Sequence, residues 1–337
     1  MKQNTALATA TLHPIQPDQV NPSLLTFCKA FADQLRLDIL RVLSRDSFGV
    51  LELVQIFESK QSGISHHLKI LANAGLVSKR REGNSIFYRR SHTVNAGELS
   101  GLQKELYKTV ELQQLSPSVE QRLTLIQQSR VEQSQFFFRD NADRFSQHQE
   151  QVAAYEMYGV NAGELITSSF QGKDATTGTV VEIGPGEGEF LESLSATFDQ
   201  VVAVDNSSEM LAKAQGFARS HTLDNIEFIL GDTKHPALNE LSIDCLVMNM
   251  VLHHVPSPAE VIFDIYKVLN TGGQFFVTEL CTHDQSWVQG SCGDLWLGFE
   301  PEDLGSWATN VGFIEGESVY LAQRNGFRVQ IRQFLKL

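Results

Sequence analysis

The chain has 337 residues, 42% of them hydrophobic and 20% charged, and this length and balance predict a globular protein of two domains. No apolar run approaches the length of a membrane span, and the N-terminus lacks the basic start and apolar core of a secretion signal. We therefore expect no membrane association. The four cysteines form no C-x-x-C pair, which favours the reducing cytoplasm.

The net charge of −13 is distributed unevenly along the chain. Residues 1–100 carry a net charge of +4, whereas residues 101–337 carry −17. Within 60–90, seven basic residues accompany a single acid, Glu82. This window indicates a polyanionic partner for the N-terminal part alone, although a solvated charged face would give the same pattern.

Helical patterns dominate the N-terminal part. Apolar residues at spacings of three and four predict a helix over 24–44, a short second helix over 50–57 and a third over 59–77. Two β-prone runs then flank residues 82–84, which is a hairpin signal. Three helices followed by a basic hairpin form a winged helix-turn-helix.

Three segments in this part resemble the ArsR family of bacterial regulators, over residues 24–92. They are ADQLRLDIL (32–40), SGISHHLKIL (62–71) leading to AGLV (74–77), and the wing RREGN (80–84) through Phe87 and Tyr88. The resemblance implies a DNA-binding regulator that recognises a double-stranded operator as a homodimer on paired half-sites.

The polar face of the third helix and the basic wing are the expected DNA contacts. Gln and Lys can reach base edges, Ser and Lys bind phosphate, and wing arginines can follow the backbone or enter the minor groove. For the two histidines, a plain helix surface or metal binding is the alternative. The predicted DNA-binding residues are Lys60, Gln61, Ser62, Ser65, His66, His67, Lys69, Arg80, Arg81, Asn84 and Arg89, with Arg90 as a further wing arginine.

The metal sites of the ArsR family have no counterpart in this sequence. The helix before the recognition helix holds no cysteine over 51–56, and residues 95–110 hold no histidine. Sensing of zinc or a soft metal is disfavoured at both places. We therefore predict no metal site and a different kind of effector.

A long helical pattern follows the wing and is interrupted by Pro117. In ArsR-like proteins a helix at this place forms the dimer interface, so the resemblance implies dimerisation here; a plain linker helix is the alternative. The aromatic side chains of this region are expected to close over the second domain: Phe136, Phe137, Phe138 and Phe145.

Strand and helix patterns alternate after residue 150, which predicts a parallel sheet covered on both faces, an α/β Rossmann-like fold. The first strand ends in VVEIGPGEGEF (180–190), where glycines let the backbone turn and approach a ligand closely. This loop is neither G-x-G-x-x-G nor a Walker loop. Asp205 ends the second strand, where it can accept both ribose hydroxyls, and Asp232 follows the third, where it can accept from an adenine amino group.

Together these motifs resemble the class I S-adenosylmethionine-dependent methyltransferases, over roughly residues 150–315. VVEIGPGEG, VVAVD, GDT and NMVLHHVPSP occur in the order of that family. By resemblance, the glycine loop holds the methionine part, Asp205 the ribose, Asn206 and Met210 the adenine ring, and Asp232 and Thr233 the adenine edge. The implied cofactor-binding residues are Glu182, Gly184, Pro185, Gly186, Gly188, Asp205, Asn206, Met210, Asp232, Thr233, Asn249 and Met250.

Methyl transfer needs mainly positioning and desolvation, so the sequence assigns no catalytic residue. There are four candidates for a proton acceptor or nucleophile: the bases His253, His254 and His283 and the thiol Cys281. For each of them, simple packing in the core or the loop is the alternative. Arsenite methyltransferases use several cysteines around the cleft, and Cys245, Cys281 and Cys292 lack their adjacent pair. Arsenic methylation is therefore disfavoured.

The sequence predicts a transcriptional regulator, in the sense of a repressor, whose methyltransferase-like domain senses S-adenosylhomocysteine or S-adenosylmethionine. It resembles the S-adenosylhomocysteine-responsive regulators, which share this layout, and the resemblance implies methyl-cycle target genes. The alternative is an active methyltransferase with its own DNA-binding domain. We expect a lead-in over 1–21, a winged helix-turn-helix over 22–95, a dimerisation or linker region over 96–148 and a methyltransferase-like domain over 149–337.

Overall fold

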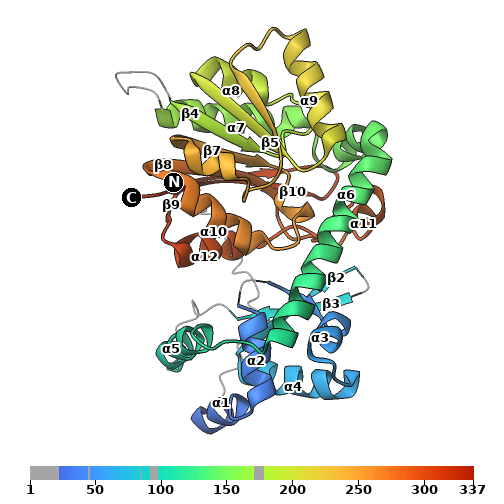
Figure 1. Cartoon of the computed structure of the whole chain (residues 1–337), viewed down its shortest axis with the longest axis vertical. Helices are drawn as coiled ribbons and strands as arrows, with labels where there is room; N and C mark the ends of the chain where they lie inside the picture. The colour runs from blue at the N-terminus through green and yellow to red at the C-terminus, as the bar shows by residue number, and fades with distance from the viewer. Residues whose placement is uncertain (1–22, 45, 84, 92–97, 171–177) are drawn as a thin grey trace, which may run out of the picture.

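The computed structural model describes residues 23–44, 46–83, 85–91, 98–170 and 178–337, with the side chains of 142–147 excepted. An N-terminal helical part with a small sheet lies below a larger layered α/β part, and the long helix α6 (Pro117–Ala153) runs from one to the other (Figure 1). No helix in the described part of the chain is long and apolar enough to cross a membrane.

The N-terminal part has the winged helix-turn-helix arrangement that the sequence predicts. The expected helix over 24–44 is two helices, because Asp33 caps the second one by accepting a hydrogen bond from the Arg36 amide at 3.1 Å. Gly75 follows the fourth helix with a φ of 70°, a backbone that favours glycine. The elements are α1 (Leu24–Ala30), α2 (Gln34–Val42), β1 (Phe48–Gly49), α3 (Val50–Phe57), α4 (Gln61–Asn73), β2 (Val77–Glu82) and β3 (Ser85–Arg90).

The three short strands form a sheet of order β1-β3-β2 whose outer hairpin, β2–β3, is the wing. Its antiparallel register places Ser78 opposite Arg89 and Arg80 opposite Phe87, so these four side chains share one face. The other face of the wing packs toward α2: the Arg90 guanidinium donates to the Leu40 carbonyl at 2.6 Å.

Two helices connect the parts. Helix α5 (Ser100–Glu111) packs on α2, and α6 then continues for 37 residues. The sequence treated Pro117 as an interruption, but it stands in the first turn of α6, where its missing N–H costs nothing. Ser116 caps this helix by accepting from the Val119 amide.

The larger part is built on a seven-stranded sheet of order β6-β5-β4-β7-β8-β10-β9. The first five strands in this order are parallel, as predicted, whereas β10 is antiparallel to both of its neighbours. The strands are β4 (Thr179–Ile183), β5 (Gln200–Asp205), β6 (Ile226–Leu230), β7 (Ile243–Asn249), β8 (Leu269–Leu280), β9 (Ile314–Ala322) and β10 (Arg328–Leu335).

Helices cover both faces of this sheet, and the alternation of side chains along each strand explains the two layers. Val181 faces a core with α10 and α12, while its neighbour Val180 faces a core with α7 and α8. The helices of this part are α7 (Tyr155–Phe170), α8 (Leu191–Thr197), α9 (Ser208–Ser220), η1 (Pro236–Glu240), η2 (Leu252–His254), α10 (Pro258–Val268), α11 (Trp287–Ser291) and α12 (Pro301–Val311).

Candidate functional site: a cavity beneath helix α6 and an exposed recognition helix

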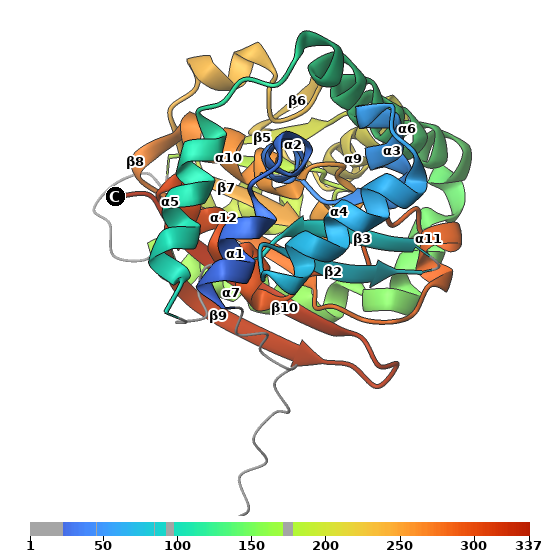
Figure 2. The same ribbon diagram turned by 90° about the horizontal axis from the view of Figure 1, so that it is seen from below.

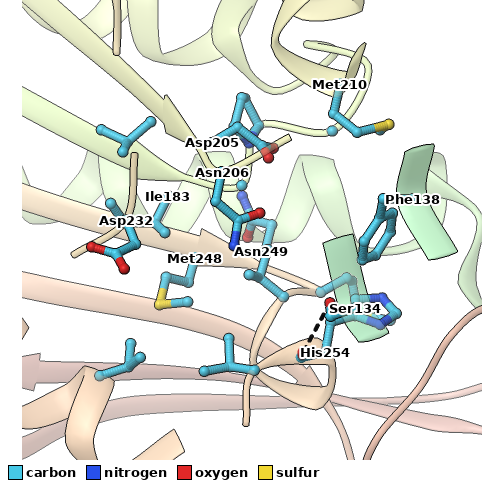
Figure 3. A pocket seen from close by; sticks show the side chains of 18 of the residues that line it. Ser134, Phe138, Ile183, Asp205, Asn206, Met210, Asp232, Met248, Asn249 and His254 are labelled. Carbon is cyan, nitrogen blue, oxygen red and sulfur yellow. Dashed lines mark hydrogen bonds between the residues drawn. The ribbon is translucent and has the colours of Figure 1, made fainter. Parts of the chain in front are cut away.

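A cavity of about 730 Å³ lies at the carboxyl ends of the parallel strands, under the middle of α6. This is the edge of an open α/β sheet at which ligands bind. Asp205, Asn249 and Asp232 reach it from the strand ends, and Ser134 and Phe138 of α6 close it from the opposite side (Figure 3).

The glycine loop forms one wall of the cavity. Gly184 follows β4 with a φ of 69°, and its amide donates to the Val204 carbonyl at 2.8 Å, which fixes the start of the loop. Gly186 has a φ of 60° and open space where a Cβ would stand, so a ligand can approach its backbone. Gly184, Pro185 and Gly186 all line the cavity, as the sequence predicts.

Gly188 lies at the far end of the glycine loop, next to α9. It is not among the described residues that line the cavity. A Cβ at this position would lie 3.1 Å from the Ala214 α-carbon and 3.1 Å from the Phe217 side chain, both on α9. This glycine is therefore required for close packing of the loop against a helix, and its contact with a ligand stays a prediction.

Glu182 lies at the bottom of the cavity and is 1% exposed. Its Oε1 accepts from Asn249 Nδ2 at 3.4 Å, while its Oε2 has no hydrogen-bond partner among the described residues. Burial raises the pKa of this carboxyl to about 8, and the Asn249 hydrogen bond offsets only part of that effect. A buried carboxylate of this kind is suited to a cationic group such as an ammonium.

Asp205 ends β5 at the cavity wall. Its Oδ1 accepts from the Ser207 amide at 2.8 Å. Burial raises the pKa of Asp205 to about 6, and the backbone hydrogen bonds partly offset this rise. Asn206 and Met210 stand beside it and face the same space (Figure 3). A carboxylate here can accept from two neighbouring hydroxyl groups.

Asp232 and Thr233 follow β6 and complete this side of the cavity. The Gly231 amide donates to the Asp205 carbonyl at 2.9 Å, which ties this turn to the end of β5. Asp232 Oδ1 accepts from the Lys234 amide at 2.8 Å. The Lys234 ammonium bridges to Glu260 at 2.9 Å, so it neutralises part of the acid at the rim.

Asn249 and Met250 end β7 and also line the cavity. Asn249 Oδ1 accepts from the Thr278 hydroxyl at 2.6 Å, which orients its amide group toward Glu182. Met250 has a φ of 57°, a left-handed backbone that is unusual for a methionine. Its amide donates to the Thr278 carbonyl at 2.8 Å, which holds the turn in place.

The sequence reasoning missed the residues that close the cavity from outside the sheet. It expected the phenylalanines of α6 to cover the second domain, and Phe138 does line the cavity, but Phe136 is 58% exposed and the side chain of Phe145 lies outside the described residues. Polar residues recur along α6, and this pattern was the signal in the sequence that could have identified the lining residues of this helix. The missed lining residues include Gln127, Gln128, Val131, Ser134, Tyr155, Tyr158, Glu189, Val255, Pro256 and Ser257.

Of the two candidate bases that follow β7, only His254 is among the described residues that line the cavity. His253 is buried and bonded through Nδ1 to Glu279 Oε1 at 2.6 Å. Burial alone would lower its pKa, but the charges of Glu279 and Asp294 outweigh that effect and raise the pKa to about 9. Burial and the charge of His253 hold the pKa of His254, which lines the cavity, well below its usual value.

The other two candidates lie off the cavity. Burial lowers the pKa of His283 to about 4 and raises the pKa of the Cys281 thiol. Neither residue is among the described residues that line the cavity, so neither is placed to act on a ligand there.

Among the described residues, one buried group of side chains has the composition of a metal site. Ligand-type atoms of His253, His254 and Asp294 lie within 4.8 Å of one another. The Nδ1 atoms of the two histidines are bonded to Glu279 and, at 3.3 Å, to the Gly293 carbonyl. These bonds and the raised pKa of His253 also fit a buried charge network without an ion. The prediction that the chain lacks a metal site remains a prediction.

The recognition helix α4 presents its predicted polar face to solvent. His67 is the most enclosed of the set: its Nδ1 lies 3.4 Å from Arg36 Nη1 and 3.7 Å from Asp33 Oδ1. The exposed residues are Lys60, Gln61, Ser62, Ser65, His66 and Lys69. This face is free to enter a major groove.

The wing is placed differently from the expectation. Arg81 is exposed, but Arg80 and Arg89 are 16% and 19% exposed in their side chains and pair with Asp303 of α12. Arg90 is buried and pairs with Glu111 at 2.7 Å. In this conformation Arg80, Arg89 and Arg90 are not free to bind DNA. Asn84 lies outside the described residues.

Two family models match the chain. Residues 33–79 match the bacterial regulatory protein, arsR family, and residues 181–277 match a methyltransferase domain. The arsenical resistance operon repressor of Bacillus subtilis is 42% identical over 78 residues, which are 23% of this chain and 70% of that protein.

An arsenite methyltransferase of Halobacterium salinarum is 30% identical over 105 residues, which are 30% of this chain and 27% of that protein. The chain thus covers less than a third of that relative. Among solved structures, an N-methyltransferase of Bradyrhizobium japonicum in complex with S-adenosylhomocysteine is 19% identical, with 52% of this chain and 84% of that chain covered at a TM-score of 0.43.

The two matched regions coincide with the two parts of the fold. The first includes α2 to α4 and the beginning of the wing, and the second runs from β4 into β8 through the glycine loop and the cavity walls. The chain therefore belongs to the arsR family of bacterial regulatory proteins, and the region behind its winged helix-turn-helix matches a methyltransferase domain.

Proposed function

We propose that this protein is a transcriptional regulator whose methyltransferase-like domain is a receptor for S-adenosylhomocysteine or S-adenosylmethionine. The observation that carries the proposal is the course of α6. Its N-terminal part packs on α3 of the DNA-reading domain, and its middle lines the cavity with Gln127, Gln128, Val131, Ser134 and Phe138. A single helix therefore contacts both the ligand site and the DNA-reading domain, which consists of α1 to α5 and the wing and is called the reader below.

The cavity fits an S-adenosyl ligand in its chemistry. Glu182 offers an unsatisfied carboxylate for the ammonium, Asp205 a carboxylate for the ribose hydroxyls, and Asp232 a carboxylate for the adenine amino group. Only a ligand that binds the two DNA-binding states unequally can regulate. The proposed targets are genes of the methyl cycle, controlled by repression in the cytoplasm.

The proposed active form is a homodimer, which suits paired half-sites. Exposed leucines on two adjacent helices of the reader support this assembly. Leu24 and Leu25 of α1 are 58% and 63% exposed, and Leu102 of α5 is 42% exposed. The two helices lie side by side at one edge of the reader (Figure 2). Such an apolar surface is costly in water and is typical of an interface.

An active methyltransferase is the second candidate function. The observation in its favour is the size of the cavity, which is about 730 Å³ in total. The cavity extends beyond the residues predicted to bind the nucleotide, as far as His254 and the face of α6. That space has room for a second small molecule next to the nucleotide. His254 lines this space, but its lowered pKa makes it a weak base, which argues against acceptors that must lose a proton.

Calorimetric titration with both nucleotides, on the wild type and on Asp205→Ala, tests the receptor directly. We expect binding by the wild type and a loss of at least about tenfold in the variant, the value of one charge-assisted hydrogen bond. A parallel incubation with methyl-labelled S-adenosylmethionine and a panel of small acceptors tests the enzyme. Label transfer at enzymatic rates, without any effect of nucleotide on DNA binding, would favour the second candidate.

A further inference from the structure

The inner face of the wing, formed by Ser78, Arg80, Phe87 and Arg89, packs against the methyltransferase-like domain instead of facing solvent. Phe87 makes an edge-on contact with Trp296 at 5.3 Å between ring centroids. The Arg80 guanidinium lies 5.4 Å from the Phe299 ring centroid. The wing is thus held by the segment 296–303.

Charged groups dominate this contact. Asp303 stands in the first turn of α12, is fully buried, and forms an ion pair with Arg89. Its Oδ2 lies 3.9 Å from Arg80 Nη1, and Arg80 also pairs with Glu82. The Oε2 of Glu82 accepts from the Leu297 amide at 2.7 Å. We call these contacts of Arg80, Glu82, Phe87 and Arg89 with residues 296–303 the wing clamp.

A carboxylate and a phosphate compete for the same guanidinium, because both offer paired oxygens to its planar fork. The two arginines that the clamp binds are among the four wing arginines that the sequence predicts to contact the DNA backbone, and the exposed Arg81 is not one of the clamped pair. The side chain of Arg89 is 19% exposed and its Nη1 is paired with Asp303, so Arg89 presents little of its guanidinium to a phosphate in this state. The clamp therefore opposes any binding mode in which the inner face of the wing contacts DNA.

We propose that the wing clamp is an autoinhibitory contact in which Asp303 takes the place of DNA phosphates on Arg80 and Arg89. The structure represents the clamped state, and full DNA binding requires the wing to leave residues 296–303. This inference rests on the proposed function, since it describes how the ligand-binding domain restrains the reader. It assigns to Asp303 a regulatory role that the ligand chemistry does not require.

The clamp is bonded to the wall of the ligand cavity. The Leu295 and Trp296 amides donate to the His253 carbonyl at 2.9 and 3.1 Å, and the Trp296 indole donates to the Val255 carbonyl at 2.7 Å. Val255 and the next two residues line the cavity. A ligand that moves this wall will therefore move the segment that grips the wing.

The next residue along the same wall ties in the reader and α6. Pro256 accepts from Arg130 Nη1 at 3.3 Å, and the Arg130 guanidinium lies 5.7 Å from the Phe87 ring centroid and 5.3 Å from that of Trp296. The Arg130 guanidinium of α6 is therefore close to both aromatic rings of the clamp, Phe87 and Trp296. These contacts give the cavity and the wing a common set of partners, which is what coupling requires.

The test compares Asp303→Asn with Glu302→Gln in the full chain. Asn keeps the shape of Asp303 and removes its charge, whereas Glu302 is the exposed neighbour on the same turn and serves as a matched control. The probe is a random-sequence duplex, so no operator needs to be known. Affinity is measured over a range of salt concentrations by fluorescence anisotropy.

We expect Asp303→Asn to bind this duplex on the order of tenfold more tightly than the wild type, the value of about one charge-assisted hydrogen bond. Its plot of log affinity against log salt should steepen by between about 0.9 and 1.8, one or two added phosphate contacts. Glu302→Gln should match the wild type. Equal affinity and equal slope for all three proteins would overturn the clamp.

Hydrogen exchange on the wild type gives a second readout that does not depend on the variant folding well. The Leu297 amide donates to Glu82 in the clamp, so it should exchange faster when the duplex is bound at saturation. Unchanged protection there in the DNA complex would contradict the clamp while leaving the proposed function intact. If neither wild type nor Asp303→Asn binds any duplex, the proposed function itself fails and the clamp fails with it.

Discussion

Arg130 and Glu52 form a two-bond ion pair that joins the long helix α6 to the DNA-reading domain. Arg130 Nε donates to Glu52 Oε1 at 2.8 Å, and Nη2 donates to Oε2 at 2.7 Å. The same Nη2 donates to the Ser47 carbonyl at 2.9 Å. The Arg130 side chain is 8% exposed and that of Glu52 is 23% exposed. The pair therefore holds α6, which also lines the cavity, against the reader.

Replacing Arg130 by Ala should destabilise the protein strongly. The change removes both Arg130 hydrogen bonds to the Glu52 carboxylate, which among the described residues keeps only the Gly49 amide as a donor, and the Arg130 hydrogen bond to the Ser47 carbonyl, which together costs about 3 kcal/mol. Urea unfolding measures the loss. The control is Lys108→Ala, since Lys108 pairs with Glu105 on an exposed helix face and should cost less than about 1 kcal/mol. Equal losses in the two variants would show that the pair is not a structural tie.

Glu182→Gln should change how the stability of the ligand-free protein depends on pH. The carboxyl has a pKa of about 8 in the folded chain against 4.5 as its ordinary value, so the folded state holds the proton more tightly. Stability is then full below 4.5 and falls as pH rises to about 8, by on the order of a few kcal/mol. Thermal unfolding across this range should show a smaller fall in the glutamine variant than in the wild type, because the raised pKa of Asp205 still contributes in both proteins.

The same carboxyl predicts the pH dependence of nucleotide binding. An ammonium group binds to the ionised form of Glu182, so affinity should rise with pH toward the pKa of about 8. Calorimetric titration of S-adenosylhomocysteine at several pH values measures the trend. Glu182→Gln should bind the nucleotide more weakly and lose most of the pH dependence. If the variant retained the wild-type trend, the pH dependence would belong to another group, such as Asp205.

Lys69→Ala should weaken DNA binding without affecting the ligand site. Lys69 is exposed on the outer face of α4, where a phosphate contact would contribute about 0.9 to the slope of log affinity against log salt. Anisotropy titrations should show that loss for Lys69→Ala and none for Lys108→Ala, which removes an equal charge from α5. Equal slopes for the two variants would place the DNA on another face.

Leu102→Glu should disrupt the proposed homodimer. A charge within an apolar interface is left desolvated and unpaired, so the variant should elute as a monomer in size-exclusion chromatography with light scattering. Leu125 of α6 is 56% exposed, and the start of α6 lies apart from α1 and α5 (Figure 2), so Leu125→Glu provides the matched control. A wild-type chain that is itself monomeric at all concentrations would remove the basis for this prediction.

Local patterns in the sequence were sufficient for much of this molecule. Apolar spacing predicted α3 and α4, the hairpin signal predicted the wing, and alternation predicted the parallel strands. The acids at strand ends, Asp205 and Asp232, could be placed in one cavity because parallel strands bring their carboxyl ends together. The predicted helices and hairpin depend on the pattern of neighbouring residues. The shared cavity depends on a general rule for parallel sheets, which needs no knowledge of particular contacts.

Long-range packing decided the rest. Nothing near Asp303 in the sequence indicates that it pairs with Arg89, more than two hundred residues away. The basic wing has the same composition whether its arginines face DNA or another domain. The role of Gly188 depended on the approach of α9, and the antiparallel pair β9–β10 lacks the helix between strands that marks the others. Such contacts appear only when the chain is folded.

The central claim is that a nucleotide in the cavity changes how the reader binds DNA. Its most direct test is the dissociation constant for a duplex selected by the wild-type chain from a random library, measured with and without saturating S-adenosylhomocysteine and S-adenosylmethionine. We expect at least one nucleotide to shift this constant by about fivefold or more, a coupling of about 1 kcal/mol. Constants that stay equal, while calorimetry shows both nucleotides bound, would contradict it.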